Sequence, residues 1–187
     1  MSTRGIYGFK YQGTYKVNYN HWDSYPSGLG VSLLHELQYY TDINKMKERF
    51  ERIILIHADD DENIDPKIVE TLSRYGYIDI HKLHEEYGNR YWHEWFVLLS
   101  EWQGSIKPYM EYDFPYMLDG TEYDMDMIEY FYIIDLDEET FDGIDYNLNY
   151  IFKIPLKLIK EVDDDMLLKF SKKVKFNLFK DNYKDNE

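Results

Sequence analysis

The chain has 187 residues, of which 44% are hydrophobic and 18% aromatic, so we expect a folded domain with a hydrophobic core rather than a disordered chain. Cysteine is absent, which excludes disulfides, thiolate zinc sites and a cysteine nucleophile. The net charge of −15 disfavours general nucleic-acid binding and suits either a basic partner or simple solubility.

The ends of the chain give a second set of expectations. The N-terminus has no signal-peptide pattern, and no apolar run approaches the roughly 18 residues of a membrane span, so we expect a cytoplasmic protein without membrane contact. Met1 precedes the small residue Ser2, and its removal would give Ser2 a free α-amine. Residues 1–179 are expected to form one globular domain, and 180–187 a polar, frayed tail.

A β-hairpin is predicted at the N-terminus. Residues 5–11 and 15–19 both alternate aromatic or apolar with other side chains, and Gln12-Gly13 lies between them. Alternation with period two is typical of strands, and glycine supplies the positive φ of a tight turn.

A polar loop follows the hairpin. Residues 20–28 contain turn formers and hydrogen-bonding groups, and apolar residues at helical spacing then predict a helix over 29–41. The loop therefore lies at a strand-to-helix junction, where free backbone N–H groups favour an anion. We expect the candidate site here, with Gln103 as a more distant contributor. The candidate catalytic residues are Ser2, His21 and Asp23, and the candidate binding residues are Arg4, Asn20, Tyr25 and Gln103.

Three further helices are predicted in the middle of the chain. Apolar spacing indicates helices over 43–54 and, after an N-cap at Asp65, over 66–75. An aromatic stripe indicates a central core helix over 90–103, ended by Gly104. Acidic residues from Asp59 onward have the spacing of a calcium loop, but Ile64 replaces its glycine, so no metal or cofactor is expected.

The C-terminal half is predicted to be mainly β. Strands are expected over 127–136, 140–144 and 150–159, with Pro155 marking an edge strand, then a helix over 163–170 and a last strand over 174–178. The predicted fold class is α+β. An antiparallel sheet that includes the hairpin would be covered by the helices near 29–41, 66–75 and 90–103.

Several short motifs resemble a broad group of uncharacterised small proteins of bacteriophages and prophages. They include Thr3-Arg4-Gly5, residues 19–30 with Tyr-Asn-His-x-Asp-Ser-Tyr-Pro-x-Gly-Leu-Gly, Gln103-Gly104, and the strand from Glu129 to Asp135. The resemblance implies an accessory protein in the cytoplasm of the infected host. Counter-defence against host immunity, as in anti-CRISPR proteins, is the role it suggests.

The first thirty residues also resemble, more weakly, the opening of N-terminal-nucleophile hydrolases. The resembling features are a processed N-terminus, a hairpin and an Asn-x-x-Asp after its second strand. It implies that Ser2 is the nucleophile, that Arg4 and Asp23 orient its amine, and that Asn20 helps hold an oxyanion.

The sequence leaves several functions open. A hydrolase would cleave an acyl bond through Ser2, or a phosphodiester with His21 as base, Asp23 as orienter and Arg4 on the phosphate. A non-catalytic protein would bind a host defence protein through its acidic surface, or sequester a small nucleotide by aromatic stacking. In a third interpretation, the loop only locks the hairpin to the helix. The hydrolase and the nucleotide-binding hypotheses both predict that four residues share one pocket, namely Arg4, Asn20, His21 and Asp23. The sequence does not predict the oligomeric state.

Overall fold

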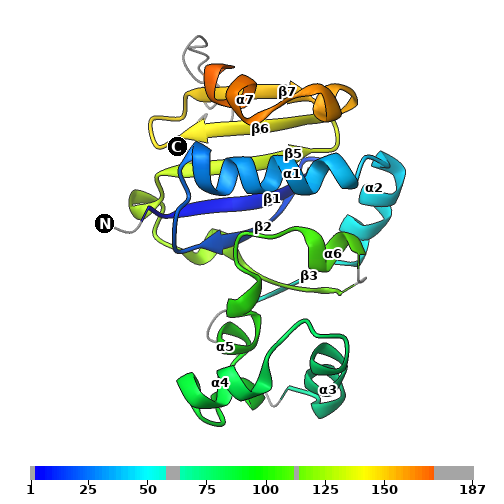
Figure 1. The fold of residues 1–187 in the computed structure, drawn as a ribbon, viewed down its shortest axis with the longest axis vertical. Coiled ribbons are helices and arrows are strands. Elements are labelled where there is room, and N and C mark those ends of the chain that lie inside the picture. The colour runs from blue at the N-terminus through cyan, green and yellow to red at the C-terminus, as the bar shows by residue number, and fades with distance from the viewer. Residues whose placement is uncertain (1–2, 58–63, 112–113, 171–187) are drawn as a thin grey trace, which may run out of the picture.

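A five-stranded sheet forms the centre of the molecule, in a computed structural model that describes residues 3–57, 64–111 and 114–170 (Figure 1). The strand order is β2-β1-β5-β6-β7. Its strands are β1 (Gly5–Tyr11), β2 (Thr14–Asn20), β5 (Tyr130–Asp135), β6 (Thr140–Asp145) and β7 (Tyr150–Pro155). The predicted α+β class and the N-terminal hairpin are both confirmed. The sheet is mixed rather than purely antiparallel, because β5 enters from the same end as β1 and pairs with it in parallel.

The strand register brings four chain segments to one end of the sheet. Gly5 lies opposite both Asn20 and Tyr130, and Tyr130 lies opposite Asp145. The residues just before β1 and β5, and those just after β2 and β6, therefore leave the sheet at the same end. At the other side of the sheet, β7 is an edge strand, as Pro155 predicted.

One face of the sheet carries the larger hydrophobic core. The helix α1 (Val31–Tyr39) crosses this face and buries Leu33, Leu34 and Leu37 against aromatic residues of the strands (Figure 1). Residues of α2 (Ile43–Arg52), α6 (Lys107–Glu111), the 3-10 helix η6 (Leu156–Glu161) and α7 (Asp164–Phe170) complete this core. We call these helices and the five-stranded sheet the sheet lobe.

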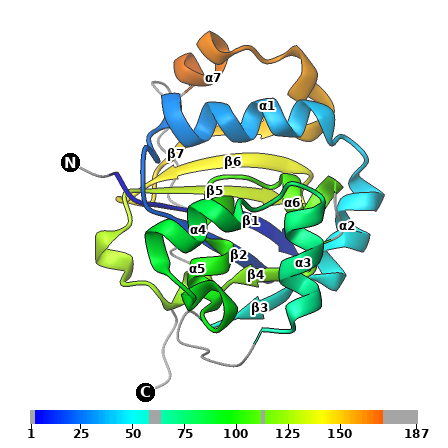
Figure 2. The same cartoon turned by 60° about the horizontal axis from the view of Figure 1, so that its bottom comes forward.

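A second hydrophobic core lies outside the sheet. It is built by α3 (Pro66–Arg74), α4 (Ile80–Tyr87), the 3-10 turn η2 (Arg90–Trp92), α5 (Trp95–Leu99) and the 3-10 turn η3 (Ser100–Trp102), which we call the helical lobe (Figure 2). The prediction that helices near 66–75 and 90–103 cover the sheet is therefore wrong, because their apolar faces pack against one another. The prediction of one domain over residues 1–179 stays a prediction.

The aromatic stripe over 90–103 forms three short pieces instead of one long helix. The backbone at Glu94 is extended, with φ −115° and ψ 109°, and this separates η2 from α5. The carboxylate of Glu94 binds Arg90 through two hydrogen bonds of 2.6 Å across the break. Tyr91, Trp95 and Trp102 are all buried in the helical lobe. We attribute the break in the helix to the packing of these rings, which overrides the helical spacing of the stripe.

Two short strands connect the lobes. β3 (Ile54–Ile56) and β4 (Tyr116–Leu118) pair in parallel, and the sequence predicted neither strand. Each has three residues, too few to show an alternating pattern.

The C-terminal predictions are met in part. The helix α7 agrees with the predicted 163–170, but the strand predicted over 150–159 ends at Pro155 and continues as η6. The strand predicted over 174–178 and the polar tail lie outside the described residues. Among the residues that are described, no helix combines the length and the apolar character needed to cross a membrane.

Candidate functional site

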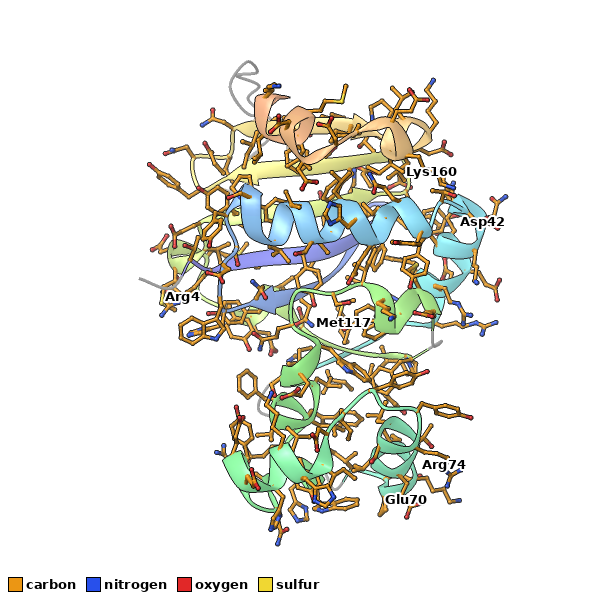
Figure 3. All side chains as sticks on the ribbon, viewed as in Figure 1. Arg4, Asp42, Glu70, Arg74, Met117 and Lys160 are labelled. Carbon is orange, nitrogen blue, oxygen red and sulfur yellow. The ribbon has the colours of Figure 1, made fainter. Side chains whose placement is uncertain are left out.

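The end of the sheet where the four segments meet carries the predicted site. We define the sheet-end surface as Arg4, the loop His21–Tyr25, residues 120–129 and the β6–β7 turn 145–149. Figure 3 shows Arg4 at this end of the molecule. Residues 120–129 include the 3-10 turns η4 (Gly120–Glu122) and η5 (Met125–Met127).

The polar loop is fixed by hydrogen bonds within the chain. The side-chain amide of Asn20 donates to Ser24 Oγ at 2.8 Å and to the carbonyl of Trp22. The amide of Ser24 donates to the Thr3 carbonyl at 3.2 Å, and its own carbonyl accepts from the Tyr132 hydroxyl at 2.8 Å. Asn20 and Ser24 are both buried. The Asn20 amide group is therefore used inside the loop, as the structural interpretation of this loop predicts.

Backbone geometry also fixes the loop. Asp23 has a positive φ of 51°, and its carbonyl accepts from the backbone N–H of Leu29 at 2.9 Å. A Cβ at Gly28 would lie 2.2 Å from that same carbonyl oxygen. Glycine is required at position 28 because the backbone at Asp23 passes too close for any side chain.

His21 is held by neighbouring side chains. Its Nδ1 lies 2.7 Å from the Tyr19 hydroxyl, and its backbone N–H donates to Gln103 Oε1 at 3.2 Å. The Tyr19 ring stacks on Tyr123 with ring centres 4.0 Å apart. Burial raises the pKa of Tyr19, and the nearby Arg4 charge opposes that rise. Gln103 thus contributes to the site, as predicted, by positioning the loop.

Asp23 is engaged with Tyr25 instead of with His21. The Tyr25 hydroxyl donates to Asp23 Oδ1 at 3.3 Å, and the carboxylate charge raises the pKa of Tyr25. Within the described part of the chain, Asp23 makes no hydrogen bond to His21. The group that contacts Nδ1 of His21 is the hydroxyl of Tyr19, so the predicted base and orienter are not joined.

Arg4 contacts residues 120–129. Its Nη1 lies 2.8 Å from the sulfur of Met127, and its backbone N–H donates to Glu129 Oε1 at 3.4 Å. Its Nε is buried and has no hydrogen-bond partner among the residues that the structure describes. In the described residues no hydrogen bond links Arg4 to Asn20, His21 or Asp23. Ser2 lies outside the described residues.

The sheet-end surface exposes apolar side chains that sequence reasoning missed, apart from Tyr25. The exposed fractions are Trp22 65%, Tyr25 40%, Met125 52%, Met127 47%, Tyr146 67% and Leu148 39%. The same segments carry six carboxylates, those of Asp23, Glu122, Asp124, Asp126, Glu129 and Asp145, against the single guanidinium of Arg4. The sequence carried no signal for this exposed 3-10 turn, since methionine alternating with aspartate over residues 124–127 has the period-two pattern of a strand.

A second polar cluster lies inside the sheet lobe. Lys10 Nζ binds Asp135 Oδ2 at 2.6 Å, and Lys153 Nζ binds Asp142 Oδ2 at 3.2 Å. Burial raises the pKa of Asp142, and the nearby charge of Lys153 opposes that rise. Both aspartates are almost fully buried, and Asp135 also accepts from two backbone N–H groups of the β5–β6 turn. These ion pairs join β1 to β5 and β6 to β7, and the exposed Lys153 is the member of the cluster nearest to solvent.

Comparisons of the chain with protein-family models, with curated proteins and with solved structures found no match. The resemblances to phage accessory proteins and to N-terminal-nucleophile hydrolases therefore stay predictions.

Proposed function

We propose that this protein is a non-catalytic binding protein whose sheet-end surface holds a basic region of a partner protein. In the phage-type accessory role suggested by the sequence, the partner is a host defence protein and binding inhibits it. The observation that carries the proposal is the set of exposed aromatic and methionine side chains among six carboxylates at one end of the sheet.

The composition of the surface supports this proposal. Tryptophan, tyrosine, methionine and arginine are enriched in protein interfaces, and a few such residues contribute most of the binding energy. Trp22 and Tyr146 are each about two-thirds exposed, so their rings are available to a partner. The surrounding carboxylates accelerate encounter with a basic surface and disfavour acidic ones.

The rigidity of the loop also supports binding. Trp22 lies between Asn20 and Ser24, whose side chains hydrogen-bond to each other. A surface that is already ordered loses little conformational entropy when it binds, and this favours affinity.

The geometry gives less support to the hydrolytic alternative. The Asn20 amide, proposed for an oxyanion, already donates to Trp22 and Ser24, and Asp23 binds Tyr25. The pairing of His21 with the Tyr19 hydroxyl is a feature that suits proton transfer. In the nucleotide-binding alternative, the base could not stack on the Tyr19 ring, because Tyr123 already stacks there. The base would have to stack on Trp22.

The test is phage plating on hosts that each carry one defence system and express this protein. The binding variant is Trp22→Ala with Met125→Ala, which removes two exposed side chains of the sheet-end surface. The matched control is Tyr39→Ala with Met166→Ala, which removes an exposed ring and an exposed methionine from α1 and α7.

We expect the wild type and the control to restore plating and the binding variant to fail while staying folded by circular dichroism. Equal plating by the binding variant and the wild type would refute the proposed surface. A His21→Ala, Asp23→Ala variant distinguishes the enzyme hypothesis from the binding proposal. If that variant alone loses activity, the hydrolytic reading is favoured.

A further inference from the structure

A cavity of about 560 Å³, open to solvent, lies at the surface of the helical lobe between the α3–α4 turn and η3. Its volume is in the range of small-molecule sites. The lining includes Ser73, Tyr77, Ile78, Asp79, His81 and Glu101. Figure 3 shows the helical lobe, marked by Glu70 and Arg74, well apart from Arg4. The cavity is therefore separate from the sheet-end surface.

The two carboxylates of the cavity are exposed, and among the described residues each accepts hydrogen bonds through one oxygen. Asp79 accepts the backbone N–H groups of His81 at 2.9 Å and Lys82 at 3.2 Å, both through Oδ1. Glu101 accepts Lys82 Nζ at 2.8 Å through Oε1. Asp79 Oδ2 and Glu101 Oε2 accept no hydrogen bond from the residues that the structure describes. The lining contains no lysine or arginine, so its charge favours a cation.

One aromatic residue, Tyr77, lines the cavity. The Tyr77 carbonyl accepts from the indole N–H of Trp102 at 2.7 Å, which ties this residue to the core of the helical lobe. The Tyr77 ring stacks on Tyr75 with ring centres 5.8 Å apart. Aromatic faces attract ammonium and guanidinium groups, so the ring and the carboxylates favour the same kind of ligand.

We infer that this cavity binds an organic cation bearing a primary ammonium or a guanidinium group, with Asp79 and Glu101 as acceptors and Tyr77 as the apolar contact. The contact between Lys82 and Glu101 shows that an ammonium group fits one side of this carboxylate. A free polyamine and a lysine or arginine side chain of a peptide both present this chemistry.

The test uses two probes on the full chain in low salt. One is spermidine, and the other is an acetylated and amidated tetrapeptide that contains one arginine and one lysine. Binding is followed by the backbone amide NMR shifts of residues 76–81 and by calorimetry. We expect saturable shifts there with at least one probe, and the probe that binds more tightly identifies the source of the cation.

Charge-changing variants distinguish a site from general attraction to an acidic protein. Glu101→Gln and Asp79→Asn should each weaken binding about tenfold, because each removes a charged hydrogen-bond acceptor. Asparagine is as good an N-cap as aspartate, so the second variant keeps the start of α4. Glu161→Gln removes one exposed carboxylate from the sheet lobe and should leave binding unchanged.

Lys82→Gln gives the sharpest expectation. Because Lys82 competes for Glu101, its removal should strengthen binding about two- to fivefold, the range of an exposed ion pair. Lys160→Gln removes the same charge from the sheet lobe and should change little. Absence of saturable shifts with both probes would overturn the inference, and so would equal effects of the Glu101 and Glu161 variants.

Discussion

The two lobes of this protein use polar side chains in opposite ways. In the sheet lobe, the polar groups of the loop, above all Asn20 and Ser24, are buried and satisfy each other. In the helical lobe, Asp79 and Glu101 line an open cavity, and each has one oxygen that accepts no hydrogen bond from the part of the chain that the structure describes. The sheet lobe therefore suits a rigid binding surface, and the helical lobe suits a small ligand.

The difference follows from how each lobe is held together. Strand pairing joins residues that are far apart in the chain, such as Gly5 and Tyr130, and α1 seals the large core on one face. The helices of the helical lobe are short, and α3 and α4 begin at aspartate N-caps. Isolated helices of this length are marginal, so the second lobe depends on its small core and on these caps.

The largest expected loss of stability comes from a substitution that creates a cavity in either hydrophobic core. Leu34 and Leu83 are fully buried, one in each core, and Leu→Ala at such sites costs about 2–5 kcal/mol. We expect Leu34→Ala to speed amide exchange in both lobes, and Leu83→Ala to speed it mainly in the helical lobe. Hydrogen exchange followed by mass spectrometry checks this. Equal exchange patterns for the two variants would show that the lobes unfold as one unit.

The next effect comes from Gly28→Ala in the sheet lobe. The added Cβ would meet the Asp23 carbonyl oxygen at 2.2 Å, so the loop must shift, at a cost of about 1–3 kcal/mol. Denaturant unfolding measures the loss of stability. Gly13→Ala meets no atom within 4 Å but has a φ of 72°, and it serves as a control for backbone strain alone. A smaller loss at Gly28 than at Gly13 would contradict the tight loop.

A smaller effect is expected from the helix caps of the helical lobe. Asp79 accepts two backbone N–H groups at the start of α4, and Asp→Ala at such a position costs about 1 kcal/mol. Asp79→Asn should restore most of that stability. Thermal unfolding of the two variants makes the comparison. If alanine and asparagine are equally destabilising, the charge of Asp79 rather than its cap matters.

The smallest expected effect concerns the pH dependence of the folding stability that arises from Glu36, the residue that connects α1 to the start of α6. Glu36 accepts from Ser105 Oγ, Ile106 N and Lys107 N, and burial raises its pKa above the ordinary value. A carboxyl group whose pKa is raised by folding stabilises the protein below its unfolded pKa of about 4.3. That stability is lost as the pH rises through the folded pKa.

Glu36→Gln should therefore remove part of the decline in stability above about pH 4.3, the unfolded pKa of glutamate. The glutamine oxygen can still accept the backbone N–H groups, and its amide can donate to Ser105. Urea unfolding of wild type, Glu36→Gln and the exposed control Glu161→Gln over this pH range provides the measurement. A wild-type curve parallel to that of Glu36→Gln would refute the assignment.

Local signals predicted several of the elements correctly. The hairpin, the Asp65 N-cap of α3 and the edge position of β7 all depend on residues within a few positions of each other. Such patterns act through the backbone of their own segment, so tertiary context seldom changes them. The polar loop was likewise located correctly at a strand-to-helix junction.

The contacts of the predicted site residues were harder to predict. His21 pairs with Tyr19 rather than with Asp23, because the positive φ of Asp23 places its carbonyl toward Leu29 and its carboxylate near Tyr25. The exposed methionines Met125 and Met127 belong to the same surface only because β5 starts beside β1. No spacing rule links residues that are more than a hundred positions apart.

The sequence by itself determined the acidic charge, the absence of thiol chemistry, the α+β class and the place of the polar loop, because composition and short-range periodicity are local properties. Only the tertiary structure decided that the sheet is mixed, that the aromatic helices form their own core, and that Trp22, Met125 and Tyr146 share one end of the sheet. These features arise from strand pairing and side-chain packing between distant segments, which no local pattern encodes.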